Sequence, residues 1–279
     1  MRRERLRCAG LRSRIEDGNS EGEFVELSGR VALVTGGAGG IGGAVVRKLA
    51  KADVAGVAIN YRKSNKEAEA LAAEIERVGV KGIALQADVQ SDEQVRAMIG
   101  KIADHFGRLD IVVNNAGVTQ WVKLTDLEGL TDAIWDEILD VNVKGAFRCA
   151  RAAQKLLEAN HGMIVNVSSI SGVLAPSTIS SLAYGTAKAA LIYMTRGLAV
   201  AMAPKVRVNC VAPAFTDTPW MSQHFGADYQ QVISDASSGF PLQRIATPDD
   251  IAGAILGLIT GGDFVTGQTL IVDGGLSLS

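Results

Sequence analysis

Short apolar runs alternate with amphipathic stretches along the chain from residue 30 onward. Runs such as Val31–Val34 and Met163–Val167 are typical of strands buried on both faces, whereas residues 66–78 carry charges on one face at helical spacing. This alternation predicts one α/β domain, in which helices cover both faces of a doubly wound parallel sheet. The expected strands are 31–34, 54–60, 82–85, 109–113, 163–167, 206–211 and 269–272. The expected helices are 41–52, 66–78, 91–106 with Ser91 as N-cap and Gln94 three residues on, 135–159, 183–202 and 249–258.

One long connection, about residues 214–244, does not fit the alternation. It mixes polar residues with Trp220, Phe225, Tyr229 and Phe240. Long connections in compact domains are often functional, so we expect a lid over a pocket, with or without small helices of its own.

The first 28 residues differ from the rest of the chain. Arginines are followed by acidic residues, and no apolar segment follows the arginines, which argues against a secretory signal. We expect a disordered extension or a non-native start over residues 1–28, with an arginine-rich transit peptide as the alternative. The catalytic domain is then expected over 29–279, with folding beginning near Leu27.

Composition narrows the functional classes. The 279 residues are 47% hydrophobic and carry a net charge of −2, so a large core is expected and nucleic acid is not the expected partner. Apolar stretches stay below the ~18 residues that cross a membrane. The three cysteines and three histidines are scattered, which indicates neither a disulfide framework nor a metal site and is typical of a cytoplasmic protein.

A glycine-rich turn directly follows the first expected strand and opens the first helix. Two glycine registers overlap in Thr35–Gly42: Gly37, Gly39 and Gly42, or Gly36, Gly40 and Gly42. Either lets backbone N–H groups approach a pyrophosphate at the helix N-terminus. The turn therefore predicts dinucleotide binding.

The end of the second strand bears on the choice of dinucleotide. NAD sites usually place an acidic residue there to bind the ribose 2′-hydroxyl, but this chain reads Asn60-Tyr61-Arg62-Lys63. Arg62, with Lys63, can neutralise a 2′-phosphate instead, which favours NADP(H). Use of NAD(H) stays open, as does the alternative that both are solvated loop cations.

Tyr184 and Lys188 lie four residues apart on one expected helix, so they share a face. A nearby ammonium favours the phenolate and lowers the pKa of a tyrosine from its usual value of about 10. The pair is a candidate device for proton transfer. The spacing alone also fits an ordinary helix surface, so the rest of the chain must decide.

Taken together and in order, four motifs resemble the classical short-chain dehydrogenase/reductase family: Thr35-Gly36…Gly40-Ile41-Gly42, Asn114-Asn115-Ala116-Gly117, Ser169 and Tyr184…Lys188. The resemblance runs from about Leu27 to Leu276. It implies a single-domain, seven-stranded Rossmann fold and a homotetramer or dimer. It also implies an enzyme that moves a hydride between a nicotinamide and a carbonyl or alcohol.

The resemblance assigns four catalytic residues. Tyr184 is implied to be the general acid in reduction and the base in oxidation, and Lys188 to lower its pKa and bind the nicotinamide ribose. Ser169 is implied to hold the substrate oxygen, and Asn142 to link Lys188 to a water relay. The strand context favours Ser169, although the family's usual spacing to the tyrosine selects Ser171; Ser168 is expected to face the packing of the strand.

The resemblance also implies a cofactor-binding set. Asp88 matches a residue that contacts adenine, and Thr218 one that contacts the nicotinamide carboxamide. The full set is Gly36, Gly40, Ile41, Gly42, Tyr61, Arg62, Lys63, Asp88, Val89, Asn115, Ala116, Gly117, Tyr184, Lys188, Pro213, Thr216 and Thr218. The chain departs from the family at Pro213-Ala214, where glycine often follows the proline. It also has a small insertion at 177–181.

Three functions are compatible with these residues: reduction of a small free carbonyl compound, reduction of a 3-oxoacyl carrier protein, and a non-catalytic regulatory role. The last is least favoured because every catalytic position is filled. An acidic carrier protein needs a basic surface, yet 157–161 and 198–202 are not basic, although Arg148, Arg151 and Lys155 lie nearby. We therefore expect a small, partly apolar substrate. Its candidate pocket residues are Val118, Ser171, Val173, Leu174, Phe215 and Trp220. The apolar stripe of Ile138, Val141, Phe147 and Ala150 is expected either at a subunit interface or against the sheet.

Overall fold

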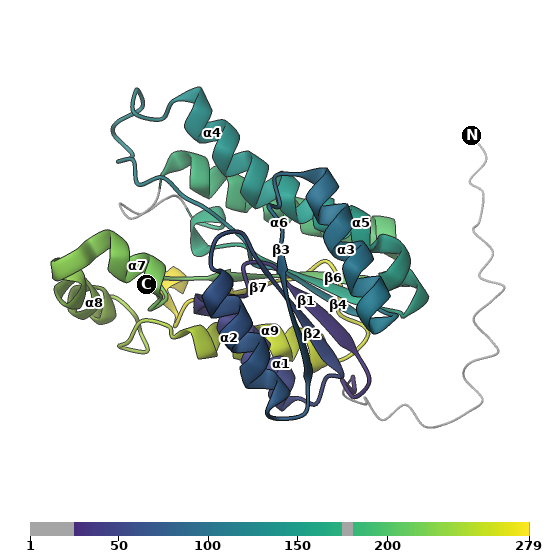
Figure 1. Cartoon of the computed structure of the whole chain (residues 1–279). Coiled ribbons are helices and arrows are strands. Elements are labelled where there is room, and N and C mark those ends of the chain that lie inside the picture. Colours follow the sequence, from purple (N-terminus) through teal and green to yellow (C-terminus); the bar gives the residue numbers. More distant parts are fainter. Residues whose placement is uncertain (1–24, 175–180, 279) are drawn as a thin grey trace, which may run out of the picture.

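The computed structural model describes residues 25–174 and 181–278. These residues form one seven-stranded parallel sheet with the strand order β3-β2-β1-β4-β5-β6-β7 (Figure 1). The order reverses between β1 and β4, which is the switch point where such sheets bind ligands beyond their carboxyl ends. The predicted single-domain Rossmann fold is confirmed.

The strands are β1 Val31–Val34, β2 Gly56–Tyr61, β3 Lys81–Gln86, β4 Ile111–Asn114, β5 Met163–Val167, β6 Arg207–Pro213 and β7 Thr269–Val272. The α-helices are α1 Gly40–Lys51, α2 Asn65–Glu76, α3 Asp92–Phe106, α4 Asp132–Leu139, α5 Ala146–Ala159, α6 Leu182–Met202, α7 Pro219–Phe225, α8 Tyr229–Ser238 and α9 Pro248–Thr260. Each expected strand and helix is present in the described residues, with bounds that shift by a few residues, apart from the helix predicted over 135–159.

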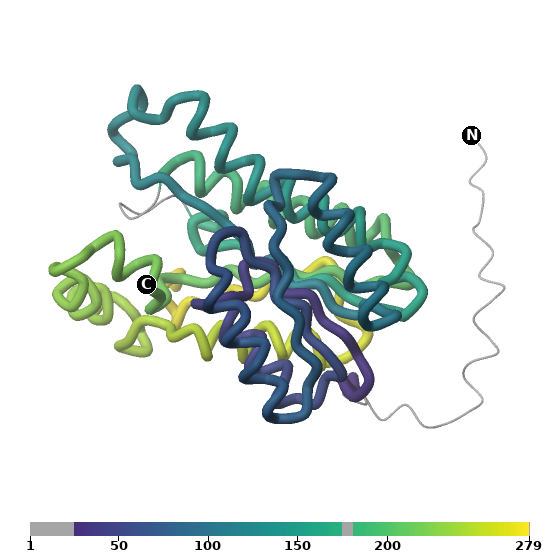
Figure 2. The backbone as a smooth tube through the Cα atoms, viewed as in Figure 1, coloured from purple at the N-terminus to yellow at the C-terminus, as the bar shows by residue number. Residues whose placement is uncertain are grey.

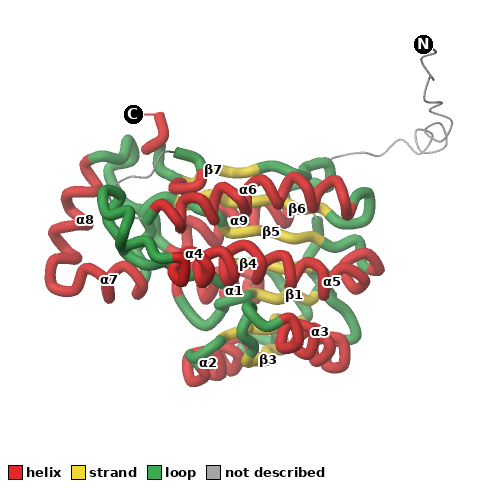
Figure 3. Tube along the Cα trace, turned by 90° about the horizontal axis from the view of Figure 1, so that it is seen from above, coloured by secondary structure: helices red, strands yellow, loops and turns green. Residues whose placement is uncertain are grey.

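The helices form two layers around the sheet (Figure 2). Helices α1, α2 and α9 pack on one face, and α3, α5 and α6 pack on the other, as the view from above shows (Figure 3). The central strands β1, β2, β4 and β5 are buried along their whole length, which explains their continuous apolar runs.

One predicted helix is wrong as a single element. Residues 135–159 form α4, a π-helical segment over Asp140–Gly145, and α5. In the wide turn, Nδ2 of Asn142 donates to the carbonyl oxygens of Ile138 and Val118, both at 2.8 Å. A side chain that bonds back to the preceding turn and out to a neighbouring loop widens the helix locally, as is common at functional sites.

The apolar stripe on this segment mainly faces the interior. Ile138, Val141 and Ala150 are buried, whereas Phe147 is exposed beneath the guanidinium of Arg151. Three of the four residues therefore pack inside the domain.

The structure confirms Ser91 as the N-cap of α3 but gives the Gln94 side chain a different partner. The hydroxyl of Ser91 accepts a hydrogen bond from the backbone N–H of Gln94 at 3.3 Å. The Gln94 side chain does not close a reciprocal capping box on Ser91; its Oε1 accepts from the backbone N–H of Asp88 at 2.9 Å. Gln94 thus ties α3 to the end of β3.

A buried carboxylate joins two central strands. Asp110 is fully buried, and its Oδ2 accepts the backbone N–H of Val31 at 2.8 Å. Arg108 forms an ion pair with Asp110 at 2.6 Å. This pair holds the entry to β4 against β1.

The segment 214–244 contains α7 and α8, so the expected lid has helices of its own. The hydroxyl of Tyr229 on α8 donates to Asp217 at 2.7 Å and holds the start of α8 against the beginning of this lid. Its function as a lid stays a prediction. Residues 1–24 of the extension expected over 1–28, and most of the insertion at 177–181, lie outside the described residues. Val25 and Leu27 pack onto the domain, because the backbone N–H of Val25 donates to Thr260 and Leu27 is buried.

Candidate active site

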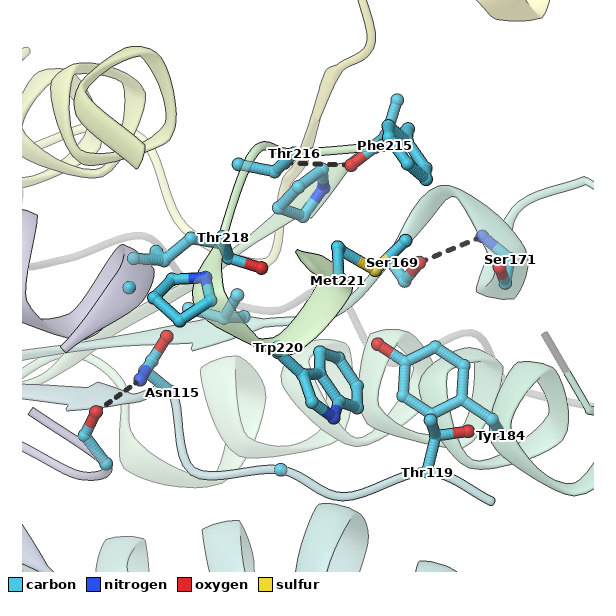
Figure 4. Close-up of a pocket in the computed structure, with 18 of the residues that line it drawn as sticks. Asn115, Thr119, Ser169, Ser171, Tyr184, Phe215, Thr216, Thr218, Trp220 and Met221 are labelled. Carbon is cyan, nitrogen blue, oxygen red and sulfur yellow. Dashed lines mark hydrogen bonds between the residues drawn. The ribbon is translucent and has the colours of Figure 1, made fainter. Parts of the chain in front are cut away.

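A cavity of about 750 Å³ opens at the carboxyl ends of the central strands. Its walls come from the glycine turn, the connection after β4, the end of β5, the start of α6 and the lid (Figure 4). The fold thus brings together segments that are far apart in sequence, at the place where a parallel sheet binds its ligand.

The glycine turn is shaped by close backbone contacts. Gly36 and Gly40 have φ of +60° and +53°, a region that favours glycine. The Nδ2 of Asn115 donates to the carbonyl oxygens of Thr35 and Gly36, at 3.0 and 3.1 Å. A Cβ on Gly42 would overlap the carbonyl oxygen of Gly36 and lie 2.6 Å from this Nδ2. Gly42 therefore permits the close packing of the turn rather than lining the cavity.

The N-terminus of α1 fits a pyrophosphate. Gly39 precedes the helix in extended conformation, no side chain caps the helix, and the first turn carries no acidic residue. Gly36, Gly39 and Gly40 line the cavity. Free N–H groups and the positive end of the helix dipole form an anion site.

The phenol of Tyr184 points toward Ser169 across the cavity (Figure 4). Burial raises the pKa of Tyr184 to about 12, and a hydrogen bond with Ser169 opposes this rise. The hydroxyl is therefore protonated at neutral pH and available as a proton donor. Ser169 Oγ also accepts the backbone N–H of Ser171 at 3.2 Å.

The neighbouring serines have different places. Ser168 is buried, and its hydroxyl donates to the backbone carbonyl of Lys188 at 2.7 Å, so it faces the packing as expected. Ser171 lines the same cavity as Ser169. The hydrogen bond to Tyr184 supports Ser169 as the serine of the site.

Lys188 is buried beneath the tyrosine, with 4% of its surface exposed. Its Nζ lies 5.4 Å from the centre of the Tyr184 ring and donates to the carbonyl oxygen of Val167 at 2.8 Å. Burial lowers the pKa of Lys188 to about 8, against a small opposing contribution from Cys210. Burial, not this ammonium, dominates the pKa of Tyr184 in the structure, so the expected lowering of that pKa is not seen.

Asn142 fixes the loop beside the lysine. Its Oδ1 accepts the backbone N–H of Val118 at 3.3 Å, and its Nδ2 donates to the Val118 carbonyl at 2.8 Å. A Cβ on Gly117 would lie 2.7 Å from Oδ1 of Asn142 and 3.5 Å from Nζ of Lys188. The absence of a side chain at Gly117 therefore leaves room for the Asn142 amide beside Lys188, and the relay role of Asn142 stays a prediction.

The basic residues after β2 lie at the rim. The guanidinium of Arg62 is 41% exposed and lies 3.8 Å from the carboxylate of Asp88. Tyr61 turns its ring into the core, where its hydroxyl bonds Asn65. Two residues that the sequence argument did not single out, Ser64 and Glu67, line the cavity nearby.

The structure brings most of the expected site residues together. The cavity wall contains Gly36, Gly40, Ile41, Asn115, Ala116, Gly117, Ser169, Tyr184, Lys188, Pro213, Thr216 and Thr218. It does not include Gly42, Tyr61, Arg62, Lys63, Asp88, Val89 or Asn142. Val89 is buried in the core against Gly145, which accounts for its absence from the wall. The contacts of these residues with a cofactor stay predictions.

The substrate side differs in part from expectation. Ser171, Phe215 and Trp220 line the cavity, whereas Val118 packs in the core and Val173 and Leu174 are surface-exposed. The sequence argument missed several wall residues, including Trp121, Thr119, Met221 and Gln223. Trp121 follows the end of β4 by only a few residues, and this position was the signal that could have found it.

The departure at Pro213-Ala214 is accommodated without strain. Ala214 does not have a positive φ, and its backbone N–H donates to the carbonyl of Val272 at 3.0 Å. Within the described ranges there is no cluster of metal-ligating side chains, and no helix there is long and apolar enough to span a membrane.

Comparison with known proteins agrees with this geometry. The family described as enoyl-(acyl carrier protein) reductase matches residues 36–277. The chain is 38% identical over 250 residues to the ketoacyl reductase 2 assigned to the granaticin polyketide synthase of Streptomyces violaceoruber, covering 89% of this chain and 96% of that protein. It is 37% identical over 255 residues to a 3-oxoacyl-[acyl-carrier-protein] reductase of Synechocystis, covering 90% and 98%. The ligand-free aldohexose dehydrogenase of Thermoplasma acidophilum superposes with a TM-score of 0.79 at 30% identity, covering 92% of this chain and 97% of that one.

The chain belongs to the short-chain dehydrogenase/reductase family. It is an NAD(P)-dependent oxidoreductase of that family, with a nicotinamide cofactor.

Proposed function

We propose that the protein interconverts a small carbonyl compound and its alcohol with NADP(H). The observation that carries this proposal is the protonated phenol of Tyr184, which hydrogen-bonds Ser169 inside the cavity and has a pKa raised to about 12 by burial. A buried phenol that faces a second hydroxyl can hold a carbonyl oxygen and donate a proton to it.

Three residues of the chain have distinct roles in the proposed reaction. Ser169 and Tyr184 bind the substrate oxygen, and Tyr184 transfers its proton to that oxygen during reduction. A bound nicotinamide would supply the hydride that reduces the carbonyl carbon. Lys188, held by the Val167 carbonyl, keeps a positive charge beneath the tyrosine below pH 8 and so favours loss of the phenolic proton. In oxidation the proton moves in the opposite direction.

Preference for NADP(H) is supported by charge at the rim. Arg62 lies at the end of β2, half-exposed, where a guanidinium can pair with a 2′-phosphate. Asp88, with which Arg62 is paired, would then share the guanidinium with the 2′-phosphate. Glu67 on the cavity wall carries a negative charge, which would oppose a 2′-phosphate. The test of function therefore also includes NAD(H).

A second candidate is reduction of a 3-oxoacyl group on a carrier protein, which is favoured by the names of the two relatives reported above. Two of the three basic residues noted near that surface are already engaged. Arg148 pairs with Asp140 at 2.9 Å, and Arg151 pairs with Asp92 at 2.6 Å. We therefore favour a free substrate. Subunit assembly as a dimer or tetramer is proposed by family analogy alone.

Initial rates with a panel of ketones, sugars, polyols and acetoacetyl thioesters, each with NADPH/NADP⁺ and NADH/NAD⁺, test this function. We expect turnover of free ketones, with a higher kcat/KM for the phosphorylated cofactor. Turnover restricted to carrier-bound thioesters would favour the second candidate, and no turnover of any carbonyl or alcohol would contradict both.

A further inference from the structure

Two tryptophans from different parts of the chain line the cavity next to the catalytic tyrosine. Trp121 belongs to the connection between β4 and α4, and Trp220 belongs to α7 in the lid. The ring centres of Trp220 and Tyr184 are 6.1 Å apart in an edge-to-face arrangement, and those of Trp121 and Trp220 are 5.8 Å apart. Figure 4 shows Trp220 beside the Tyr184 ring. A group attached to a carbonyl held by Tyr184 therefore lies within reach of Trp220.

The two indoles retain surface for a ligand. Trp220 lines the cavity and is 41% exposed, so the protein core does not cover the whole indole. Trp121 stacks its other side on His224, with ring centres 3.9 Å apart and an angle of 14° between planes. His224 does not line the cavity. It stacks on Trp121 from outside the cavity wall, while Trp121 itself lines the cavity.

Charge is scarce on this wall. Among the described residues that line the cavity, the charged ones are Glu67, near the glycine turn, and the buried Lys188. No described cation at the tryptophan end is available for a carboxylate or phosphate on the substrate. Aromatic faces beside a proton donor suit a flat, uncharged, unsaturated group, because indoles favour edge-to-face and offset contacts with other rings.

We propose that Trp121 and Trp220 are specificity-determining residues that select carbonyl compounds with an aromatic ring next to the reacting carbon. His224 is a positioning residue, which acts by holding Trp121 in place. This inference rests on the proposed function, since it needs the carbonyl oxygen to lie at Tyr184.

A matched pair of ketones tests the substrate class: 1-phenylethanone and 1-cyclohexylethanone have the same carbon skeleton, but one ring is flat and the other puckered. With NADPH, we expect kcat/KM to favour the phenyl compound by about 2- to 10-fold, the usual size of an aromatic pair contact. The ratio is expected to fall to about one in Trp121→Leu and Trp220→Leu. Trp135→Leu is the matched control, because Trp135 lies outside the cavity wall, and it should keep the wild-type ratio.

Calorimetric binding of 1-phenylethanol and 1-cyclohexylethanol to the NADP⁺-loaded protein separates this inference from the proposed function, because it needs no turnover. Tighter binding of the phenyl alcohol, lost in Trp220→Leu, supports the aromatic wall even if neither ketone is reduced. Equal binding of the two alcohols by the wild type would overturn the inference even if the enzyme reduces other ketones. So would an unchanged preference in both leucine variants.

His224 is tested by exchange of its ring. His224→Ala should reduce the phenyl preference and shift tryptophan emission to longer wavelength, because Trp121 loses its cover. His224→Phe retains a stacking ring and should restore both readouts. An emission maximum and a substrate ratio that stay at wild-type values in His224→Ala would remove the positioning role.

Discussion

The Nζ of Lys188 lies 5.4 Å from the centre of the Tyr184 ring while it donates a 2.8 Å hydrogen bond to the carbonyl of Val167. The spacing of one turn in α6 places the Lys188 ammonium beneath the Tyr184 phenol. A hydrogen bond to Val167, the last residue of β5, holds the ammonium there. The lysine is held by the sheet, and in the proposed mechanism its positive charge assists loss of the phenolic proton. This relationship leads directly to a prediction about pH.

Reduction at saturating NADPH is expected to slow as pH rises through about 8. The pKa of Lys188 is lowered to about 8, so the lysine is charged below that pH and neutral above it. The pKa of Tyr184, raised to about 12, keeps the proton donor intact across the same range. A kcat profile from pH 6 to 10 checks this, with NADPH Kd measured at both ends as the control. A profile that stays level to pH 10 would contradict a role for the lysine charge.

Replacement of Gly117 by alanine is expected to impair catalysis without unfolding the protein. The new Cβ would lie 2.7 Å from Oδ1 of Asn142, so this amide must shift, and 3.5 Å from Nζ of Lys188, which is an ordinary contact distance. Displacement by about 1 Å near a reacting centre costs up to about 10²-fold in rate. Gly100→Ala on α3 is the control, because its Cβ meets open space. Equal kcat/KM values for the two variants would show that this packing is not important for the reaction.

Arg62→Ala is expected to raise the KM for NADPH about tenfold. This increase corresponds to the lower end of the free energies of hydrogen bonds to charged groups, because the guanidinium is half-exposed. The KM for NADH should change little, since NADH has no 2′-phosphate. Lys63→Ala is the comparison at the adjacent cation. Parallel changes with both cofactors in Arg62→Ala would remove the argument for NADP(H).

Asp110→Ala is expected to lower the free energy of unfolding by about 1–3 kcal/mol, the usual cost of leaving a buried hydrogen-bonding group without its partner. The change leaves the N–H of Val31 without its acceptor and Arg108 without its counter-ion. Urea unfolding measures it. Asp92→Ala removes a solvent-exposed partner of Arg96 and Arg151 and should shift the midpoint much less. Similar shifts in both variants would show that burial of Asp110 contributes little.

The sequence predicted the sheet and its glycine turn well, because both depend on local patterns. Val31–Val34 is apolar since both faces of β1 are covered, and the glycines follow it directly. The π-helical turn at Asp140–Gly145 was not predictable in this way. Within it, Asn142 donates a hydrogen bond to Val118, a contact made across the fold that a local pattern does not show.

The same limit applies to the site. Tyr184 and Ser169 were predicted through the family resemblance, which ties each to a fixed place on a helix or after a strand, and both line the cavity. The place of Trp121 after β4 could have indicated it, but its stacking on His224 of the lid is a contact made only after folding. The direction of the Tyr184 pKa was also not predictable, since spacing shows that Lys188 is near but not that burial raises this pKa.

Tyr184→Phe provides the most direct test of the central claim, that the Tyr184 phenol transfers the proton. Single-turnover oxidation of bound NADPH, followed at saturating ketone, should slow by at least about 10²-fold, the contribution typical of a positioned acid. The Kd for NADPH should stay near its wild-type value, because the ring and its packing are retained. A variant that binds NADPH normally and still turns over within about tenfold of the wild type would contradict the account.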